Sequence, residues 1–256
     1  MLERGESEPM LVATKTLLDT GVDESGCASC YGFPSLEINN VTVEFDRALK
    51  KGAMYRIAFE IDVAAANARG VAVCNIRAYC SQSVAEHVFA CLLNLTHSLG
   101  ACTADVRAGK WQTSADFCLL SHPLRELSAM TLGIVGYGEL GRTVARIART
   151  FDMQVLISAR PGQPGGADRV AFDELLERCD VISLHCPLNE HTEGLFGARE
   201  FQRMKSSAIL INTARGALVD TAALAAALRS REIAAAAIDV LPKEPPVDGD
   251  PLLDYE

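Results

Sequence analysis

Short apolar segments alternate with helical patterns over the second half of the chain, and this alternation limits the fold more than any other feature of the sequence. Apolar strands that are regularly separated by helices indicate a parallel sheet that is covered on both faces. We therefore expect an α/β fold built on a doubly wound parallel sheet. The expected strands span 131–135, 154–158, 181–185, 208–211 and 235–240, and the expected helices span 140–150, 172–178, 198–204 and 221–229.

The turn after the first of these strands has the sequence Gly-Tyr-Gly-Glu-Leu-Gly. It stands between a buried strand and a helix, which is the context that a dinucleotide-binding turn requires. Gly136 permits the tight turn, Gly138 lets the backbone approach a pyrophosphate, and Gly141 lets helix and strand pack closely. The free amides of the helix start, from Glu139 and Leu140, then favour a phosphate. The pattern predicts a Rossmann-type cofactor site, and the alternative is a glycine-rich turn that binds nothing.

The end of the second strand bears on which dinucleotide binds. Enzymes that prefer NAD place an Asp or Glu about 20 residues after the glycines, where it holds the ribose hydroxyls. In this chain Ala159 stands at that position and Arg160 follows it. Without the carboxylate a 2′-phosphate is not repelled, and a guanidinium can pair with it. We expect an NAD(P) site that prefers NADP. The alternative is that Arg160 is a solvated loop residue and selectivity is poor.

Charge and hydropathy exclude several kinds of partner. The net charge of −9, from 24 basic and 33 acidic residues, argues against a nucleic acid or an anionic membrane. It leaves an anionic small molecule open, because a cleft can be locally positive. The apolar stretches fall short of the roughly 18 residues of a membrane span, and the acidic start is unlike a signal peptide. We expect a cytoplasmic protein with a small-molecule partner.

The nine cysteines follow no regular spacing, which suits a reducing compartment better than a disulfide framework. The one Cys-x-x-Cys pattern, Cys27 to Cys30, has no second pair and no nearby histidine. We expect no metal site and interpret these two residues as loop thiols, with zinc or redox chemistry as the minor alternative.

The first 80 residues have weaker patterns. Residues 10–18 could form a short helix, 38–45 alternate as a strand does, and 71–74 form a short buried strand. Ser83 and Glu86 then have the spacing of a capping box, which predicts that a long helix starts there.

Further motifs occur in a fixed order along the chain. They are Asp62-Val63 with 68–75, then 83–87, 107–111, 185–188 with Thr192, 211–216 and 239–245. Together they resemble the D-isomer-specific 2-hydroxyacid dehydrogenases over about residues 61–253, and the chain is identified as a member of that family. The stretch 117–141 is most similar to glycerate dehydrogenases, also called hydroxypyruvate reductases.

The resemblance implies a hydride transfer between the nicotinamide and C2 of a small 2-keto or 2-hydroxy acid, such as hydroxypyruvate and D-glycerate. Arg215 is expected to bind the substrate's carboxylate and carbonyl oxygen, because a guanidinium fork matches them. Glu244 is expected to hydrogen-bond a histidine and raise its pKa. Taken singly, Arg215 could be a structural salt-bridge residue and Glu244 a solvated charge. The resemblance assigns cofactor contacts to Pro187, Thr192, Thr213, Ala214, Arg215 and Asp239.

The chain departs from the family at both ends. The family's histidine follows the glutamate by twenty or more residues in a Pro-His pair, whereas this sequence ends at Glu256. The family's glycine-rich substrate loop should precede Asp62, where residues 55–60 contain no glycine. We therefore expect 1–80 to be an incomplete substrate-binding domain and 81–256 a dinucleotide-binding domain that is truncated before its return to the first. The five histidines, none at the family's position, are His87, His97, His122, His185 and His191.

Three hypotheses follow: a dehydrogenase, a non-catalytic NAD(P)-binding module, and an inactive fragment. Loss of the general acid costs about 10² to 10⁴ in rate, so we expect dinucleotide binding with very slow reduction. The resemblance also implies a homodimer formed largely through the helix that begins near Ser83. A helix packed within its own domain explains the same apolar residues, which are Val84, Val88, Leu92 and Leu95.

Overall fold

The computed structural model describes residues 18–21, 54–56, 68, 70 and 80–253. The contacts divide the chain into two units, Met1–Arg77 and Ala78–Glu256. In the first unit, β1 (Leu18–Gly21) pairs antiparallel with β2 (Met54–Arg56). Leu18 therefore starts a strand, and the predicted helix is wrong at that residue. The rest of that helix, the strands predicted over 38–45 and 71–74, and the Cys-x-x-Cys pair lie outside the described residues.

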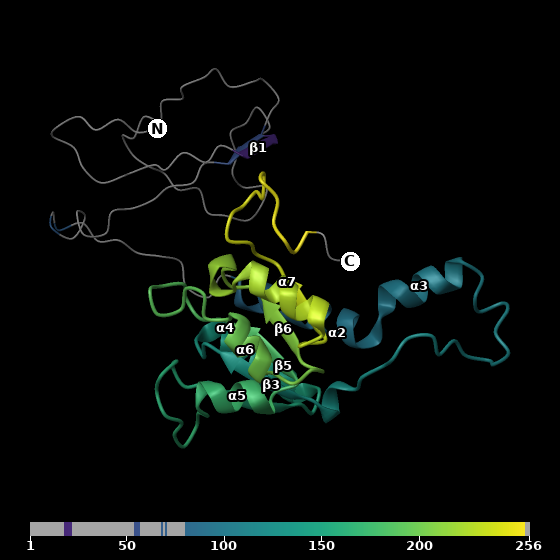
Figure 1. Ribbon diagram of the computed structural model, residues 1–256, viewed down its shortest axis with the longest axis horizontal. Coiled ribbons are helices and arrows are strands. Elements are labelled where there is room, and N and C mark those ends of the chain that lie inside the picture. Colours follow the sequence, from purple (N-terminus) through teal and green to yellow (C-terminus); the bar gives the residue numbers. More distant parts are fainter. Residues whose placement is uncertain (1–17, 22–53, 57–67, 69, 71–79, 254–256) are drawn as a thin grey trace. The chain divides into compact units, whose positions relative to one another are not determined.

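The second unit contains the predicted parallel sheet (Figure 1). Its five strands pair in the order β4-β3-β5-β6-β7, and every neighbouring pair is parallel. This confirms the α/β fold. Strands β4, β5 and β7 end one or two residues earlier than predicted, whereas β3 matches the prediction and β6 is shifted by one residue toward the C-terminus. The strands are β3 (Thr131–Val135), β4 (Gln154–Ile157), β5 (Val181–Leu184), β6 (Ile209–Asn212) and β7 (Ala235–Ile238).

Helices connect the strands and cover both faces of the sheet. The connecting helices occur where the sequence predicts them. The sequence does not predict the helix over residues 99–107. The α-helices are α2 (Ser81–His97), α3 (Leu99–Arg107), α4 (Glu139–Thr150), α5 (Phe172–Arg178), α6 (Ala198–Arg203) and α7 (Thr221–Ser230), and the 3₁₀ helices are η2 (Leu127–Ala129) and η3 (Gly216–Leu218).

Strand side chains alternate between two apolar clusters, one on each face. On β3, Leu132 and Ile134 join the cluster under α2 and α4, whereas Val135 joins the cluster under α5, α6 and α7. The other interior strands alternate in the same way, as strand geometry requires. This two-sided burial explains why the sequence shows continuous apolar strands rather than alternating ones.

The capping box predicted at Ser83 and Glu86 is wrong. The N-cap of helix α2 is Cys80, three residues before Ser83, and no side chain caps the helix. Ser83 therefore lies inside the first turn, and its hydroxyl donates to the carbonyl oxygen of Cys80 at 3.1 Å. Val88 and Leu92, two of the expected dimer residues, are fully buried in their own domain.

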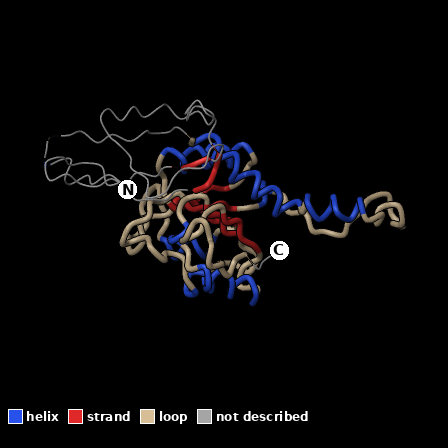
Figure 2. The backbone as a smooth tube through the Cα atoms, turned by 90° about the horizontal axis from the view of Figure 1, so that it is seen from above, coloured by secondary structure: helices blue, strands red, loops and turns tan. Residues whose placement is uncertain are grey.

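An arm formed by residues 99–124 projects from this domain (Figure 2). It consists of α3 and the loop that returns toward η2. The carboxylate of Asp105 holds the two parts together, because it lies 2.5 Å from Nζ of Lys110 and 2.9 Å from Nε2 of His122. The large apolar side chains that the arm exposes are Leu99, Val106, Trp111, Phe117, Leu120 and Leu124.

Candidate functional site: the carboxyl ends of the sheet strands

The glycine-rich turn is shaped by close backbone contacts. Gly136 has φ +100°, and a Cβ there would lie 2.4 Å from the backbone nitrogen of Cys186. A Cβ on Gly141 would lie 2.1 Å from the carbonyl oxygen of Gly136. Gly138 is different, because a Cβ at that position would meet nothing within 4 Å. Two glycines are therefore required by packing, and Gly138 leaves an open space above the turn.

The first turn of α4 faces this space with free backbone amides. The helix begins at Glu139 after Gly138, and no side chain within the described residues caps it. The first amides of a helix have no partner within the helix, and they carry a partial positive charge that suits phosphate. The backbone of Glu139, Leu140 and Gly141 therefore fits a pyrophosphate, although the Glu139 side chain is acidic.

The strand order places a switch point beside this turn. The chain goes from β3 outward to β4 and then back across to β5 on the other side. In open α/β sheets, ligands bind in the crevice outside the carboxyl ends at such a point. Just past the paired residues Val135, Leu184, Asn212 and Ile238, the register sets four residues side by side. We call this set the carboxyl row: Gly136, His185, Thr213 and Asp239.

Two side chains of the carboxyl row hold buried polar atoms without a partner. Nδ1 of His185 and Oγ1 of Thr213 are buried, and neither has a hydrogen-bond partner among the described residues. Burial lowers the pKa of His185 to about 4, so the imidazole is neutral near pH 7. Buried polar groups are normally satisfied. These unsatisfied atoms, together with the space over Gly138, fit a bound dinucleotide.

At the end of β4, two arginines lie near the position that selects the cofactor. Ala159 is buried, and its amide donates to the carbonyl oxygen of Val170. Arg160 is exposed, and no carboxylate within the described residues pairs with it. Arg169, which the sequence reasoning missed, donates from Nη1 to the carbonyl oxygen of Ser158 at 3.1 Å. Backbone hydrogen bonds between 157–159 and Val170 bring Arg169 to the end of β4.

The turn after β5 is held by Thr192. Its hydroxyl donates to the carbonyl oxygen of Pro187 at 2.7 Å and accepts from the amide of Asn189 at 2.8 Å. Thr192 is buried and Pro187 is exposed. The Thr192 side chain thus shapes the turn, and the exposed face of the turn is left for a ligand.

Arg215 and Glu244 lie on loops that are in contact. A Cβ on Gly216 would lie 1.9 Å from the carbonyl carbon of Leu241, so only glycine permits this approach. Arg215 is exposed and donates from Nη1 to the carbonyl oxygen of Ala214 at 2.6 Å. No carboxylate within the described residues pairs with Arg215, so the fork is open to an anion. Glu244 accepts from the amide of Leu241 at 2.8 Å.

The histidines of the described residues contact other groups. His87 on α2 lies 3.2 Å from Oδ1 of Asp239, and both side chains are about half exposed. His185 is bonded to Ser183, and His122 to Asp105. His97 contacts Thr96 and His191 contacts Glu190. Within the described part of the chain, Glu244 has no histidine partner.

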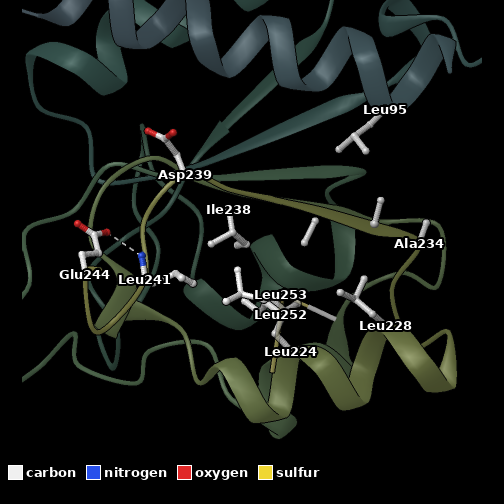
Figure 3. Close-up of a pocket in the computed structure, with 12 residues that line it drawn as sticks. Leu95, Leu224, Leu228, Ala234, Ile238, Asp239, Leu241, Glu244, Leu252 and Leu253 are labelled. Atoms are coloured by element: carbon white, nitrogen blue, oxygen red, sulfur yellow. Dashed lines mark hydrogen bonds between the residues drawn. The ribbon is translucent and has the colours of Figure 1, made fainter. Parts of the chain in front are cut away.

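A cavity of about 650 Å³ borders β7 and α7 (Figure 3). Asp239 and Glu244 lie toward one end of it, whereas Leu224, Leu228 and Leu252 line the rest. Its lining contains no basic side chain. This composition does not suit an anionic substrate. Asp239 belongs both to this lining and to the carboxyl row, so the cavity adjoins the row at the end of β7.

Sequence reasoning missed three residues of this site: Arg169, His87 and His185. His185 stands at a predicted strand end, but the sequence pattern assigns it no role. Arg169 and His87 reach the site only through the tertiary fold. The one usable sequence signal was that His185 directly follows an apolar strand, as Thr213 and Asp239 do. Among the described residues, no group of acidic, histidine or cysteine side chains could hold a metal ion, and no helix could span a membrane.

The doubly wound sheet, the glycine turn and the uncapped helix start define a Rossmann-type dinucleotide-binding domain. The chain belongs to the D-isomer specific 2-hydroxyacid dehydrogenase family, because the model of that family's NAD binding domain matches residues 89–256. This confirms the resemblance that the motifs indicated.

Named relatives agree with this membership. The chain is 43% identical over 196 residues to a glycerate dehydrogenase of Methylorubrum extorquens, covering 77% of this chain and 62% of the relative. It is 38% identical over 197 residues to a hydroxypyruvate reductase of Blautia hydrogenotrophica, covering 75% of this chain and 61% of the relative. Among solved structures, an acyclic imino acid reductase in complex with NADPH and D-Arg has a TM-score of 0.62 at 32% identity, covering 74% of this chain and 61% of that chain. The chain thus spans about three fifths of the length of these relatives.

Proposed function

We propose that this protein transfers a hydride between a nicotinamide dinucleotide and a small 2-keto or 2-hydroxy acid, with hydroxypyruvate and D-glycerate as the favoured pair. The observation that carries the proposal is the carboxyl row, which runs from the glycine turn toward the Arg215 loop. The names of the glycerate dehydrogenase and hydroxypyruvate reductase relatives support this substrate pair.

Each part of the crevice has a distinct task in this proposal. The amides at the start of α4 and the space over Gly138 receive the pyrophosphate. The exposed fork of Arg215 binds the carboxylate and carbonyl oxygen of the acid with paired hydrogen bonds, which orient C2. Asp239, held by His87, faces the nicotinamide half. The bound cofactor supplies or accepts the hydride.

The proposed reaction also needs a proton donor. Glu244 accepts a hydrogen bond from Leu241, and no described histidine contacts it. This observation favours a second candidate function, a dinucleotide-binding protein with little or no turnover. We expect binding together with reduction that is about 10² to 10⁴ slower than with a general acid in place.

A direct test measures NADPH consumption by the 1–256 chain with hydroxypyruvate, after calorimetry has established cofactor binding. Turnover on the order of 1 s⁻¹ or more would mean that another acid serves. In Arg215→Ala we expect residual turnover to vanish while the cofactor Kd changes less than about threefold. Arg215→Lys keeps the positive charge but lacks the guanidinium fork, so we expect it to recover little of the turnover. Loss of cofactor binding in both variants would assign Arg215 a structural role instead.

We propose that the cofactor is NADP(H) rather than NAD(H). Arg160 and Arg169 supply positive charge at the end of β4, and the buried Ala159 offers no carboxylate there. A neighbour at 32% identity was solved with NADPH. We expect Arg160→Ala to raise the Kd of NADPH about tenfold and to leave that of NADH unchanged, because only NADPH carries the 2′-phosphate. Calorimetric titrations check this, with Arg149→Ala on α4 as the control. Equal affinities of the wild type for both cofactors would contradict the preference.

We propose that the protein forms a homodimer, and that the arm, rather than α2, provides the apolar contact surface. Phe117 and Leu120 are 92% and 82% exposed. The arm, residues 99–124, carries two basic and two acidic residues, so it is neutral in a chain of net charge −9. The neutral apolar arm does not repel the arm of a second chain. The remaining surface, which is net negative, does repel a second chain.

Substitution of the arm tests this dimer. In the double variant Phe117→Ser/Leu120→Ser we expect the dimer to dissociate at micromolar concentration, because buried apolar area drives association. Sedimentation velocity measures it. The control Val247→Ser removes another exposed apolar side chain, 73% exposed, away from the arm, and should stay dimeric. A wild type that is monomeric at high concentration would contradict the proposal.

A further inference from the structure

His87 and Asp239 form a pair at the end of β7. Nε2 of the imidazole lies 3.2 Å from Oδ1 of the carboxylate, and the two side chains are 48% and 50% exposed. Figure 3 shows the Asp239 carboxylate pointing toward α2, the helix that carries His87 and Leu95, and away from the leucines of the cavity. A partner at one ring nitrogen orients an imidazole and decides which nitrogen carries the proton. The pair is therefore an oriented imidazole that water can reach.

Cys91, one turn further along α2, contacts the same ring nitrogen. Its Sγ lies 3.7 Å from Nε2 of His87. Burial, with a smaller contribution from the Asp239 charge, raises the pKa of the Cys91 thiol, so the thiol is protonated near pH 7. The charge beside the imidazole is thus that of Asp239. Both contacts within the described residues use Nε2, so the ring keeps Nδ1 for a further partner.

Asn212 joins this pair to the loop of Arg215. Its carbonyl oxygen accepts from the amide of Asp239 at 3.0 Å, and its side-chain Nδ2 donates to the carbonyl oxygen of Arg215 at 2.9 Å. Asn212 is fully buried, so both segments are held in place by one residue. The Arg215 guanidinium folds back onto the carbonyl oxygen of Ala214, which keeps it near the end of β6. An acid bound at this guanidinium therefore lies beside the end of β7.

Reducing a 2-keto acid takes a proton at the carbonyl oxygen in addition to the hydride at C2. The donor must hold a proton near pH 7 and must regain it from water. His185 does not meet this requirement, because burial lowers its pKa to about 4. His87 is half exposed and pairs with the segment that packs against the Arg215 loop. The other described histidines bond within their own segments: His97, His122 and His191.

We propose that His87, oriented by Asp239, donates the proton to the carbonyl oxygen in the slow reduction expected of this chain. The inference rests on the proposed function and names its proton donor. The hydride that the bound cofactor supplies forms the new C–H bond at C2, and the C=O π pair moves to the oxygen. The His87 imidazolium gives that oxygen its proton and becomes neutral imidazole. The keto acid is thereby reduced and the cofactor oxidised, and water returns the proton to the half-exposed ring.

Kinetics of His87→Ala test the proton transfer. We expect the residual kcat with hydroxypyruvate to fall at least about tenfold, while KM and the Kd of NADPH change less than about twofold, because a proton donor acts only in the transition state. Added imidazole should restore turnover to this variant. Pyrazole, which has the same ring shape but is not protonated near pH 7, should not. The control His97→Ala removes a histidine from the other end of α2 and should react as wild type.

Oxamate, an analogue of a 2-keto acid that is not reduced, gives a readout without turnover. In NMR spectra of the wild type with bound NADPH, we expect oxamate to shift the ring signal of His87 and to leave that of His97 in place. The loss of a signal in His87→Ala, or in His87→Gln if the alanine variant does not fold, identifies it. Arg215→Ala should abolish the shift, because the analogue is no longer held beside Asp239.

Each outcome decides for or against His87. Oxamate that binds by calorimetry without moving the His87 signal would overturn the inference and leave the proposed function in place. An unchanged kcat in His87→Ala would overturn it as well. Equal recovery with imidazole and pyrazole would do the same, because the ring would then only fill space. A wild type without any turnover would overturn the proposed hydride transfer, and this inference with it.

Discussion

Replacing Gly141 by alanine is expected to abolish dinucleotide binding and to destabilise the domain. The added methyl would stand 2.1 Å from the carbonyl oxygen of Gly136, and neither group belongs to a flexible side chain. Helix α4 must then move away from β3, which carries the free amides away from the phosphate. Overpacking of this kind costs about 1–3 kcal/mol. We expect the Kd of NADPH to rise by more than about 100-fold in calorimetry, with a lower midpoint in thermal unfolding.

Gly138→Ala adds the same methyl group to the same turn and is the control for Gly141→Ala. Nothing lies within 4 Å of its added methyl, so the fold should keep its stability to within about 1 kcal/mol. The methyl would occupy the space that the pyrophosphate needs, and affinity should fall although the protein is intact. Wild-type affinity in Gly138→Ala would show that the phosphates bind elsewhere. Unaltered stability in Gly141→Ala would show that helix and turn can separate without cost.

Acid is expected to destabilise the domain through His185. Burial lowers the pKa of this imidazole to about 4 in the folded protein, whereas an unfolded histidine titrates near pH 6.5. Below pH 6.5 the His185 imidazole is therefore protonated in the unfolded chain but still neutral in the folded chain. The free energy of unfolding consequently falls as the pH falls toward 4. His185 alone lowers the free energy of unfolding by about 2 kcal/mol between pH 7 and pH 5.

Urea unfolding at pH 7 and pH 5 measures this loss. The wild type should lose about 2 kcal/mol more than His185→Asn over that interval, since the variant has no imidazole to protonate at this position. The other histidines contribute equally to both proteins and cancel in the difference. Equal losses would mean that His185 is protonated freely in the folded state and that the carboxyl row is open to water.

The local parts of the fold were predictable because they depend on neighbouring residues. The strand at 131–135, the glycine turn and the helix after it follow from apolar periodicity and from residue types that permit a sharp turn. Helix ends are less well defined by local pattern, as Ser83 shows. Ser83 and Glu86 have the spacing of a capping box, yet α2 starts at Ser81. The local pattern therefore did not define the start of the helix.

Contacts between distant segments were not predictable in this way. Arg169 reaches the end of β4 because Val170 bonds to 157–159, and nothing in its local sequence marks that return. His87 meets Asp239 across more than half the length of the chain. The buried state of Val88 and Leu92 likewise depends on α2 packing against the sheet, which periodicity cannot distinguish from a dimer surface.

The class of fold, the phosphate turn and the family can be inferred from the amino-acid sequence, because each is encoded in short runs of residues whose local geometry is restricted. Which strand ends stand side by side depends on long-range packing. Strand order and register are set by the packing of helices on both faces of the sheet. That order brings Gly136, His185, Thr213 and Asp239 into one row, and two buried polar atoms of this row have no partner among the described residues.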